Sequence, residues 1–329
     1  MSPPPPAAAP PPAPSPGRRR PLWQHAAPWL VTAACFAYLY TRLERAAAAR
    51  GQALVPYLAG IFQDVDWVRW LALMAPYCLV FLLVDTLVAW RVITWFNVRL
   101  AYGDILPVRA SAYILSIVNE QASKGAIALY LSRRHGVPGW EVASSMLFVM
   151  FCEYYYLLGW ATVGVTLHRE RLPAVFHVIP WLAALSAAGF VAFHLFFTGR
   201  ILPRVALRDR PIFHAFRRAS VARYAGVLLL RSPLMLAAAV TYALALGLFG
   251  VQVSVGEMLG YLPVIFFGAA MPGPMHSVAI VLWVVLFPDR PGEMTAFGFV
   301  QHNFFVLFNA AVGLVFLRRA TRALLAAAP

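Results

Sequence analysis

Charge is scarce in this sequence: only 12% of its 329 residues are charged, whereas 61% are hydrophobic. An average soluble domain has roughly 25% charged and 45–50% apolar residues. This shortage excludes an ordinary globular enzyme, a nucleic-acid-binding domain and a disordered chain. Acidic residues are the rarer sign, with 13 Asp and Glu against 27 Lys and Arg. We interpret the net charge of +14 as arginine-rich loops of a membrane protein, because the apolar runs are long enough to span a bilayer.

Lysine and cysteine are also rare. Lys124 is the only lysine, so a lysine-based phosphate grip has a single candidate. The three cysteines lie inside apolar stretches without CxxC spacing, which favours buried thiols over disulfides or a metal site. The sequence contains no GxSxG, HExxH, zinc-ligand or Walker A pattern. No recognised catalytic set supports an enzyme, and we expect neither a cofactor nor a metal.

The N-terminal region differs in composition from the rest of the chain. Its first 17 residues contain nine prolines, and Arg18, Arg19 and Arg20 follow. A chain so rich in proline cannot form a core, so we expect a disordered cytoplasmic arm over residues 1–21. A polytopic membrane domain is predicted over residues 22–322, with a short C-terminal tail over 323–329.

Six apolar stretches have about the length needed to cross a bilayer as a helix, which is roughly twenty residues. The first of them, Pro28–Leu43, is a little short, so we expect its true start nearer Leu22. The predicted spans are Pro28–Leu43, Val68–Trp90, Val142–Thr166, Ala174–Phe197, Tyr224–Leu248 and Met294–Leu317.

Two further apolar stretches are interrupted. Ala110–Leu131 contains a polar run, and Gly256–Phe287 is broken by Pro272, Gly273 and Pro274, which disfavour a continuous helix. If both stretches dip in and return, most arginines lie on one side, as the positive-inside rule requires. We therefore expect an all-α membrane protein with six full spans and two re-entrant hairpins that enter from opposite faces. Both termini would then be cytoplasmic.

Paired broken segments of this kind indicate a central translocation site. The alternative is that both stretches are interfacial or proline-kinked helices with no transport role. No residue-level repeat relates the two halves, so an inverted-repeat arrangement rests on topology alone.

The polar run of the first broken stretch is a candidate substrate site. Glu120 and Lys124 are four residues apart, so they could form a local ion pair on one helix face. Asn119 precedes them, and together these residues form a polar tip that suits a head-group pocket. A purely structural ion pair is the alternative.

Charged residues inside the predicted spans also need a reason, because each costs about 2.5–3.5 kcal/mol at the bilayer centre. Glu153 precedes three tyrosines that could satisfy its carboxylate or surround a head-group. The alternative is a carboxylate that is hydrogen-bonded to a neighbouring helix. Arg231 could snorkel to the interface or bind an anionic lipid phosphate. Asp85 could reach the interface or pair with an arginine.

Two late regions supply the remaining candidates. His276 follows the Pro-Gly-Pro break, and His302 and Asn303 lie in the last predicted span. Each of these side chains could instead be a core group whose hydrogen bonds are satisfied within the protein. Gly256 and Gly260 form a GxxxG pattern, which is weak evidence for close helix contact.

Two of these regions carry a family resemblance. Asn119–Ala126 (NEQASKGA) and Tyr130–Pro138 (YLSRRHGVP) resemble the centre of the flippase-like membrane domains. These domains form the transmembrane region of lysylphosphatidylglycerol synthases and their stand-alone bacterial relatives. Met271–Met275 is similar to the second Pro/Gly-rich turn of that family, and Glu153 stands where the family has an acidic residue.

The resemblance covers roughly residues 25–320 and implies a lipid-translocating protein of the bacterial inner membrane. Its partner would be a membrane lipid with an anionic or lipid-linked head-group, and a homo-oligomer or a separate lipid-modifying enzyme is possible. The usual Pro-x-x-Gly-Glu turn is replaced here, which leaves the substrate open. No aminoacyl-transferase region follows the last span, so aminoacylation is not implied. A membrane-embedded enzyme, an accessory subunit and a structural membrane protein are the alternatives.

The predicted topology can be tested by labelling single introduced cysteines in intact cells. We expect Ser132→Cys and Thr321→Cys to react only from the cytoplasmic side, and Gln252→Cys only from outside. Reaction of position 132 from outside would convert Ala110–Leu131 into a full span.

Overall fold

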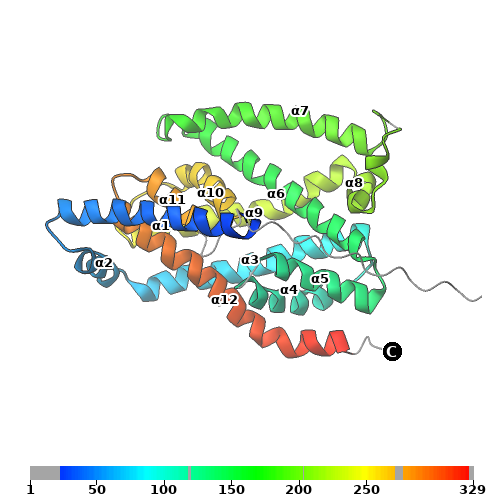
Figure 1. Ribbon diagram of the computed structural model, residues 1–329, viewed down its shortest axis with the longest axis horizontal. Coiled ribbons are helices and arrows are strands. Elements are labelled where there is room, and N and C mark those ends of the chain that lie inside the picture. The colour runs from blue at the N-terminus through cyan, green and yellow to red at the C-terminus, as the bar shows by residue number, and fades with distance from the viewer. Residues whose placement is uncertain (1–22, 118–119, 203, 271–276, 326–329) are drawn as a thin grey trace, which may run out of the picture.

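The computed structural model describes residues 23–117, 120–202, 204–270 and 277–325 (Figure 1). Regular structure in these ranges is entirely helical. The α-helices are α1 (Trp23–Ala49), α2 (Leu54–Gln63), α3 (Trp67–Phe96), α4 (Tyr102–Ser116), α5 (Glu120–His135), α6 (Gly139–Leu167), α7 (Ile179–Phe197), α8 (His214–Arg218), α9 (Val221–Gly247), α10 (Val255–Ala269), α11 (Ser277–Leu286) and α12 (Pro291–Leu325). Short 3₁₀ helices are η1 (Ala174–Val178), η2 (Ala206–Asp209) and η3 (Pro211–Phe213).

Five helical segments in the described ranges are long and apolar enough to cross a membrane. They are Trp67–Phe96, Gly139–Leu167, Ala174–Phe197, Val221–Gly247 and Pro291–Arg322. Each overlaps one predicted span, with ends that differ by no more than six residues, so the expected all-helical membrane architecture agrees with the structure. The predicted sixth span lies in α1, which has 27 residues but is not among the five. Tyr38, Tyr40 and Arg42 make this helix less apolar, so the sixth span stays a prediction.

The structure describes the predicted domain boundary at the C-terminal end only. The predicted arm, residues 1–21, lies outside the described residues. The last helix α12 continues to Leu325, three residues into the predicted C-terminal tail.

The first interrupted stretch forms a hairpin of two short helices, α4 and α5. Tyr130 and Arg134 near the end of α5 lie beside Gly103 and Asp104 at the start of α4, so the helices are antiparallel. Neither helix has the twenty residues that a span requires. The hairpin begins at Tyr102, eight residues before the predicted start at Ala110.

The first hairpin folds back along α3 from the end at which α3 finishes. Tyr102 at the start of α4 packs edge-on against Trp90, with ring centroids 6.0 Å apart. Tyr113 near the end of α4 packs against Phe81, which lies close to the middle of the 30-residue α3. The tip of the hairpin therefore reaches mid-depth in the bundle.

The second interrupted stretch forms the α10–α11 hairpin. Tyr261 in α10 packs against Phe287, which follows α11, with ring centroids 4.8 Å apart, so these helices are also antiparallel. A capping box between Ser254 and Glu257 starts α10. The Pro272–Pro274 break lies outside the described residues.

A close backbone contact joins α10 to α6. A methyl group added to Gly164 of α6 would overlap the backbone of Gly260, and one added to Gly256 would overlap the ring of His168. The GxxxG pattern is therefore the face of α10 that packs on α6. Further along, Phe267 contacts Tyr154, so α10 runs from the end of α6 to its middle.

The two hairpins enter the bundle from opposite ends. Ser145 near the start of α6 donates a hydrogen bond to the Asn97 side chain at the end of α3 (2.6 Å), so α3 and α6 run in opposite directions. The first hairpin starts beside the end of α3, and the second starts beside the end of α6. Figure 1 shows them on different sides of the bundle, with α7 along its edge.

The glycine contact can be tested with two matched substitutions in α6. Gly164→Ala should lower the melting temperature in detergent, because overpacking costs about 1–3 kcal/mol. Gly159→Ala has open space around the new methyl group and should be neutral or stabilising, since alanine favours a helix. Equal melting temperatures for the two variants would show that α6 and α10 do not pack this closely.

Candidate functional site

Four charged side chains from four helices meet inside the bundle. Asp85 comes from α3, Arg109 from α4, Glu153 from α6 and Arg231 from α9. Arg109 Nε donates to Asp85 Oδ2 at 2.6 Å, and Arg231 Nη2 lies 3.4 Å from Asp85 Oδ1. Arg231 Nη1 donates to Glu153 Oε1 at 2.7 Å. We call these four residues the charge cluster.

The charge cluster lies at mid-depth. Glu153 is the midpoint of the 29-residue α6. Arg231 follows the start of α9 by ten residues, and Asp85 precedes the end of α3 by eleven. At 1.5 Å per residue these positions are about 15–21 Å from the nearest helix end. Simple snorkelling of Arg231 to the interface, one of the two predicted options, is therefore not what the structure shows.

Hydrogen bonds from neighbouring side chains hold the cluster in place. The Tyr113 hydroxyl donates to Asp85 Oδ2 at 2.9 Å, and the Arg109 guanidinium lies over the Tyr113 ring. Arg109 Nη1 also lies 3.4 Å from the Ser123 hydroxyl, near the start of α5. These contacts connect both helices of the first hairpin to α3.

The four charges differ in exposure. The side chains of Arg231, Asp85 and Arg109 are only 8%, 11% and 12% exposed, whereas that of Glu153 is 40% exposed. Two carboxylates balance two guanidiniums, which removes the net charge that would otherwise be buried. Arg231 Nε has no hydrogen-bond partner among the described residues. The cluster is therefore accessible at Glu153, and the Nε donor of Arg231 is available for a further hydrogen bond.

The structure brings together two predicted site residues, Glu153 and Arg231, as a direct ion pair. The tyrosines after Glu153 do not satisfy its carboxylate as proposed from the sequence. Tyr154 and Tyr155 bond Ser186 of α7, and the Tyr156 hydroxyl donates to the Arg231 carbonyl at 3.0 Å. The tyrosines thus fasten α6 to its neighbours.

Asp85 pairs with arginines, which is one of its two predicted alternatives; it does not reach the interface. Arg109 and Tyr113 were not predicted as site residues, and Arg109 was placed outside the hairpin. In the structure Arg109 is the eighth of the 15 residues of α4, so it lies halfway along the first helix of the hairpin. The sequence feature that indicates a residue such as Arg109 is Asp85, because a carboxylate in an apolar run needs a cation from another segment.

Four predicted residues cannot be located to the same detail. Asn119 and His276 lie outside the described residues. Glu120 and Lys124 belong to the first two turns of α5, and the structure describes their backbone only. The backbone places both near the hairpin tip, one on each side of Ser123.

The predicted residues of the last span have separate environments. His302 is buried in α12. The Asn303 amide donates to the Phe299 carbonyl of its own helix at 2.7 Å. The neighbouring Gln301 donates to the Tyr242 hydroxyl on α9. Hydrogen bonds within the protein therefore account for the amide donors of Gln301 and Asn303.

Among the described residues, no group of three or more His, Cys, Asp or Glu side chains could hold a metal ion. Compared with known proteins, the chain matches no family model, and neither a curated protein nor a solved structure is similar to it.

The contribution of the charge cluster can be measured with the same substitution at two positions of α3. Asp85→Asn should destabilise the protein by about 3–5 kcal/mol, because it leaves buried guanidinium charge without compensation. Asp66→Asn keeps a good N-cap and alters only an exposed pair with Arg69, so it should cost less than about 1 kcal/mol. Unfolding in detergent micelles gives both values, and similar values would mean that the cluster is not buried.

Proposed function

We propose that this protein moves a lipid, or a lipid-linked head-group, between the leaflets of a membrane. The observation that carries the proposal is the charge cluster at mid-depth between two helical hairpins that enter from opposite ends. The resemblance of Asn119–Ala126 and Tyr130–Pro138 to flippase-like domains points the same way. The membrane would be the cytoplasmic membrane of a bacterium, with both termini in the cytoplasm.

The cost of the cluster supports a polar path. A charged side chain at the bilayer centre costs about 2.5–3.5 kcal/mol on insertion scales, and four charged side chains meet at mid-depth in this bundle. Apolar residues of similar volume often stabilise a core at least as well as a buried ion pair. A cluster of this kind is better explained by a polar ligand that must pass the bilayer centre.

The hairpins support the same proposal. Non-helical backbone at membrane depth is tolerated where protein or a water-filled cavity satisfies its polar groups. In transporters, broken helices of this kind surround the substrate at the midplane. We propose that both hairpins are re-entrant and that their tips, which include Asn119, Glu120, Lys124 and His276, contact the head-group.

Arg231 is the proposed ligand of an anionic head-group. Its guanidinium has five donors in a planar fork that matches a phosphate, and one of them, Nε, is unused. Glu153 is the exposed member of the cluster, so an entering phosphate would replace it at Arg231. Asp85 stays held by Arg109 and Tyr113 during this exchange. The acyl tails would remain in the surrounding lipid.

A scrambling assay in liposomes tests the proposal, with head-group-labelled phosphatidylglycerol as the probe. Arg231→Lys keeps the positive charge but loses the two-pronged grip, so movement between leaflets should slow by about tenfold. The reason is that a hydrogen bond to a charged group contributes about 1.5–3 kcal/mol. Arg69→Lys, on the exposed end of α3, is the matched control and should behave like wild type.

Lys124→Gln is a second variant for the hairpin tip and should also slow movement if the tip contacts the head-group. Melting curves must show that every variant is folded. Unchanged movement in folded Arg231→Lys and Lys124→Gln proteins would exclude this site. Chemical conversion of the lipid in detergent, where no leaflets exist, would instead favour a membrane-embedded enzyme.

A further inference from the structure

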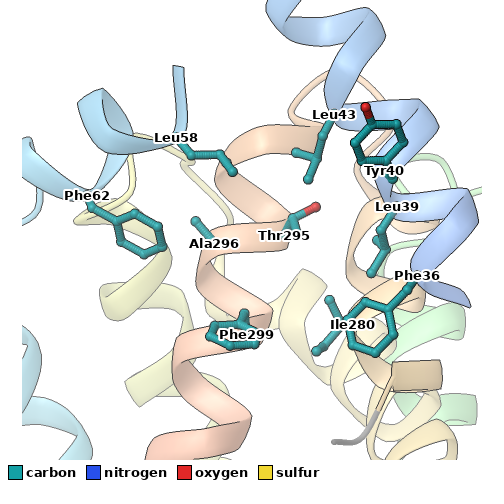
Figure 2. A pocket seen from close by; sticks show the side chains of 10 residues that line it. All are labelled: Phe36, Leu39, Tyr40, Leu43, Leu58, Phe62, Ile280, Thr295, Ala296 and Phe299. Atoms are coloured by element: carbon teal, nitrogen blue, oxygen red, sulfur yellow. The ribbon is translucent and has the colours of Figure 1, made fainter. Parts of the chain in front are cut away.

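A second feature lies away from the charge cluster, between α1 and α2. It is an apolar groove of about 450 Å³, and side chains from α1 and α2 face each other across α12 (Figure 2). The residues that line it are Phe36, Leu39, Tyr40, Leu43, Leu58, Phe62, Ile280, Thr295, Ala296 and Phe299. This volume falls within the range of small-molecule pockets, roughly 300–1,000 Å³.

The groove has a closed floor and an open rim. Leu39, Leu43 and Ala296 in the floor are almost completely buried. Tyr40 and Phe299 at the rim are 54% and 42% exposed. A ligand can therefore enter from the side. Entry from the lipid phase rests on the predicted span in α1, which would turn the open side toward the lipid.

The lining excludes a polar occupant. Thr295 is the only polar residue of the floor, and its hydroxyl already donates to the Pro291 carbonyl at 2.7 Å. A buried ligand with hydroxyl or amide groups would lose hydrogen bonds to water without replacement. An empty groove would also cost the dispersion contacts of its walls. A flexible hydrocarbon chain meets both conditions.

A positive charge lies next to one end of the groove. Arg42 does not line the groove, but it precedes the lining residue Leu43, and its Nη2 donates to the Pro288 carbonyl at 3.0 Å. Its side chain is partly exposed, so an anionic group at this end can bond its other guanidinium donors. Tyr40 adds a side chain typical of the membrane–water interface.

We propose that the groove holds one acyl chain of a phospholipid from the surrounding bilayer, with the lipid phosphate beside Arg42. The chain would run from Leu43 toward Phe36 and Phe299. This site is separate from the charge cluster, so it does not depend on lipid movement between leaflets.

Photocrosslinking tests the proposal on the full chain in vesicles of equal parts phosphatidylethanolamine and phosphatidylglycerol. The probe is a phosphatidylglycerol with a diazirine on one acyl chain, and crosslinked peptides are identified by mass spectrometry. We expect peptides that contain Leu39 or Ala296 to be crosslinked several-fold more than α7 peptides with Trp181, although Trp181 is 78% exposed. Crosslinks that follow exposure, with α7 most labelled, would overturn the proposal.

Filling the groove supplies the matched comparison. Ala296→Phe should reduce crosslinking in the groove several-fold, whereas Ala187→Phe on the exposed face of α7 should not. Leu58→Trp fills the groove from the α2 side and is the second variant if Ala296→Phe does not fold. Unchanged groove crosslinking in a folded filled variant would also overturn the proposal.

The Arg42 contact has its own comparison. Arg42→Gln should reduce crosslinking of the phosphatidylglycerol probe to the level of a diacylglycerol probe with the same chains. Arg69→Gln, the control, should leave the two probes distinguishable. Identical labelling by both probes in the wild type would remove the phosphate from the proposal.

Discussion

The carboxylate of Asp85 accepts hydrogen bonds from guanidiniums that belong to two different helices. Arg109 approaches from the first hairpin and Arg231 from α9, and the Tyr113 hydroxyl completes the coordination. Lipid tails are as apolar as the helix surfaces, so they provide no hydrophobic drive for helices to associate. A charge that must be neutralised inside the bundle supplies a strong and directional constraint instead. It fixes how far α4 reaches along α3.

The two hairpins are held by different forces. The first depends on charge and hydrogen bonds, whereas the second depends on the absence of side chains where Gly164 and Gly260 bring two backbones together. Close approach through small residues gains dispersion energy over a large contact area. The first hairpin reaches Phe81 in the middle of α3, and the second reaches Tyr154, which is next to Glu153 in the middle of α6.

The long helices were predictable because a run of twenty apolar residues has few alternatives to a membrane span. The two breaks were also predictable, since Pro272 and Pro274 and the polar run before Lys124 oppose a continuous helix. Which charges meet was not predictable, because Asp85, Arg109 and Arg231 are brought together by tertiary packing between distant segments. Arg109 was assigned to a loop because the hairpin starts eight residues before its apolar run begins. The α1 side of the groove has helical spacing, at Phe36, Leu39, Tyr40 and Leu43, but this spacing does not show which helix lies opposite.

The sparse packing of α7 determines how much its sequence has to specify. Only 6% of its apolar window is buried, and the side chains of Trp181 and Leu185 lie almost fully outside the protein. Ser186 forms hydrogen bonds with both tyrosine hydroxyls from α6, and the Phe190 and Phe193 rings pack on Phe151. These few positions dictate the register of the helix. Apart from these residues and Phe197, which is buried against Phe213 and Phe216, one apolar side chain of α7 can replace another, so this helix encodes little beyond its length and its solubility in lipid.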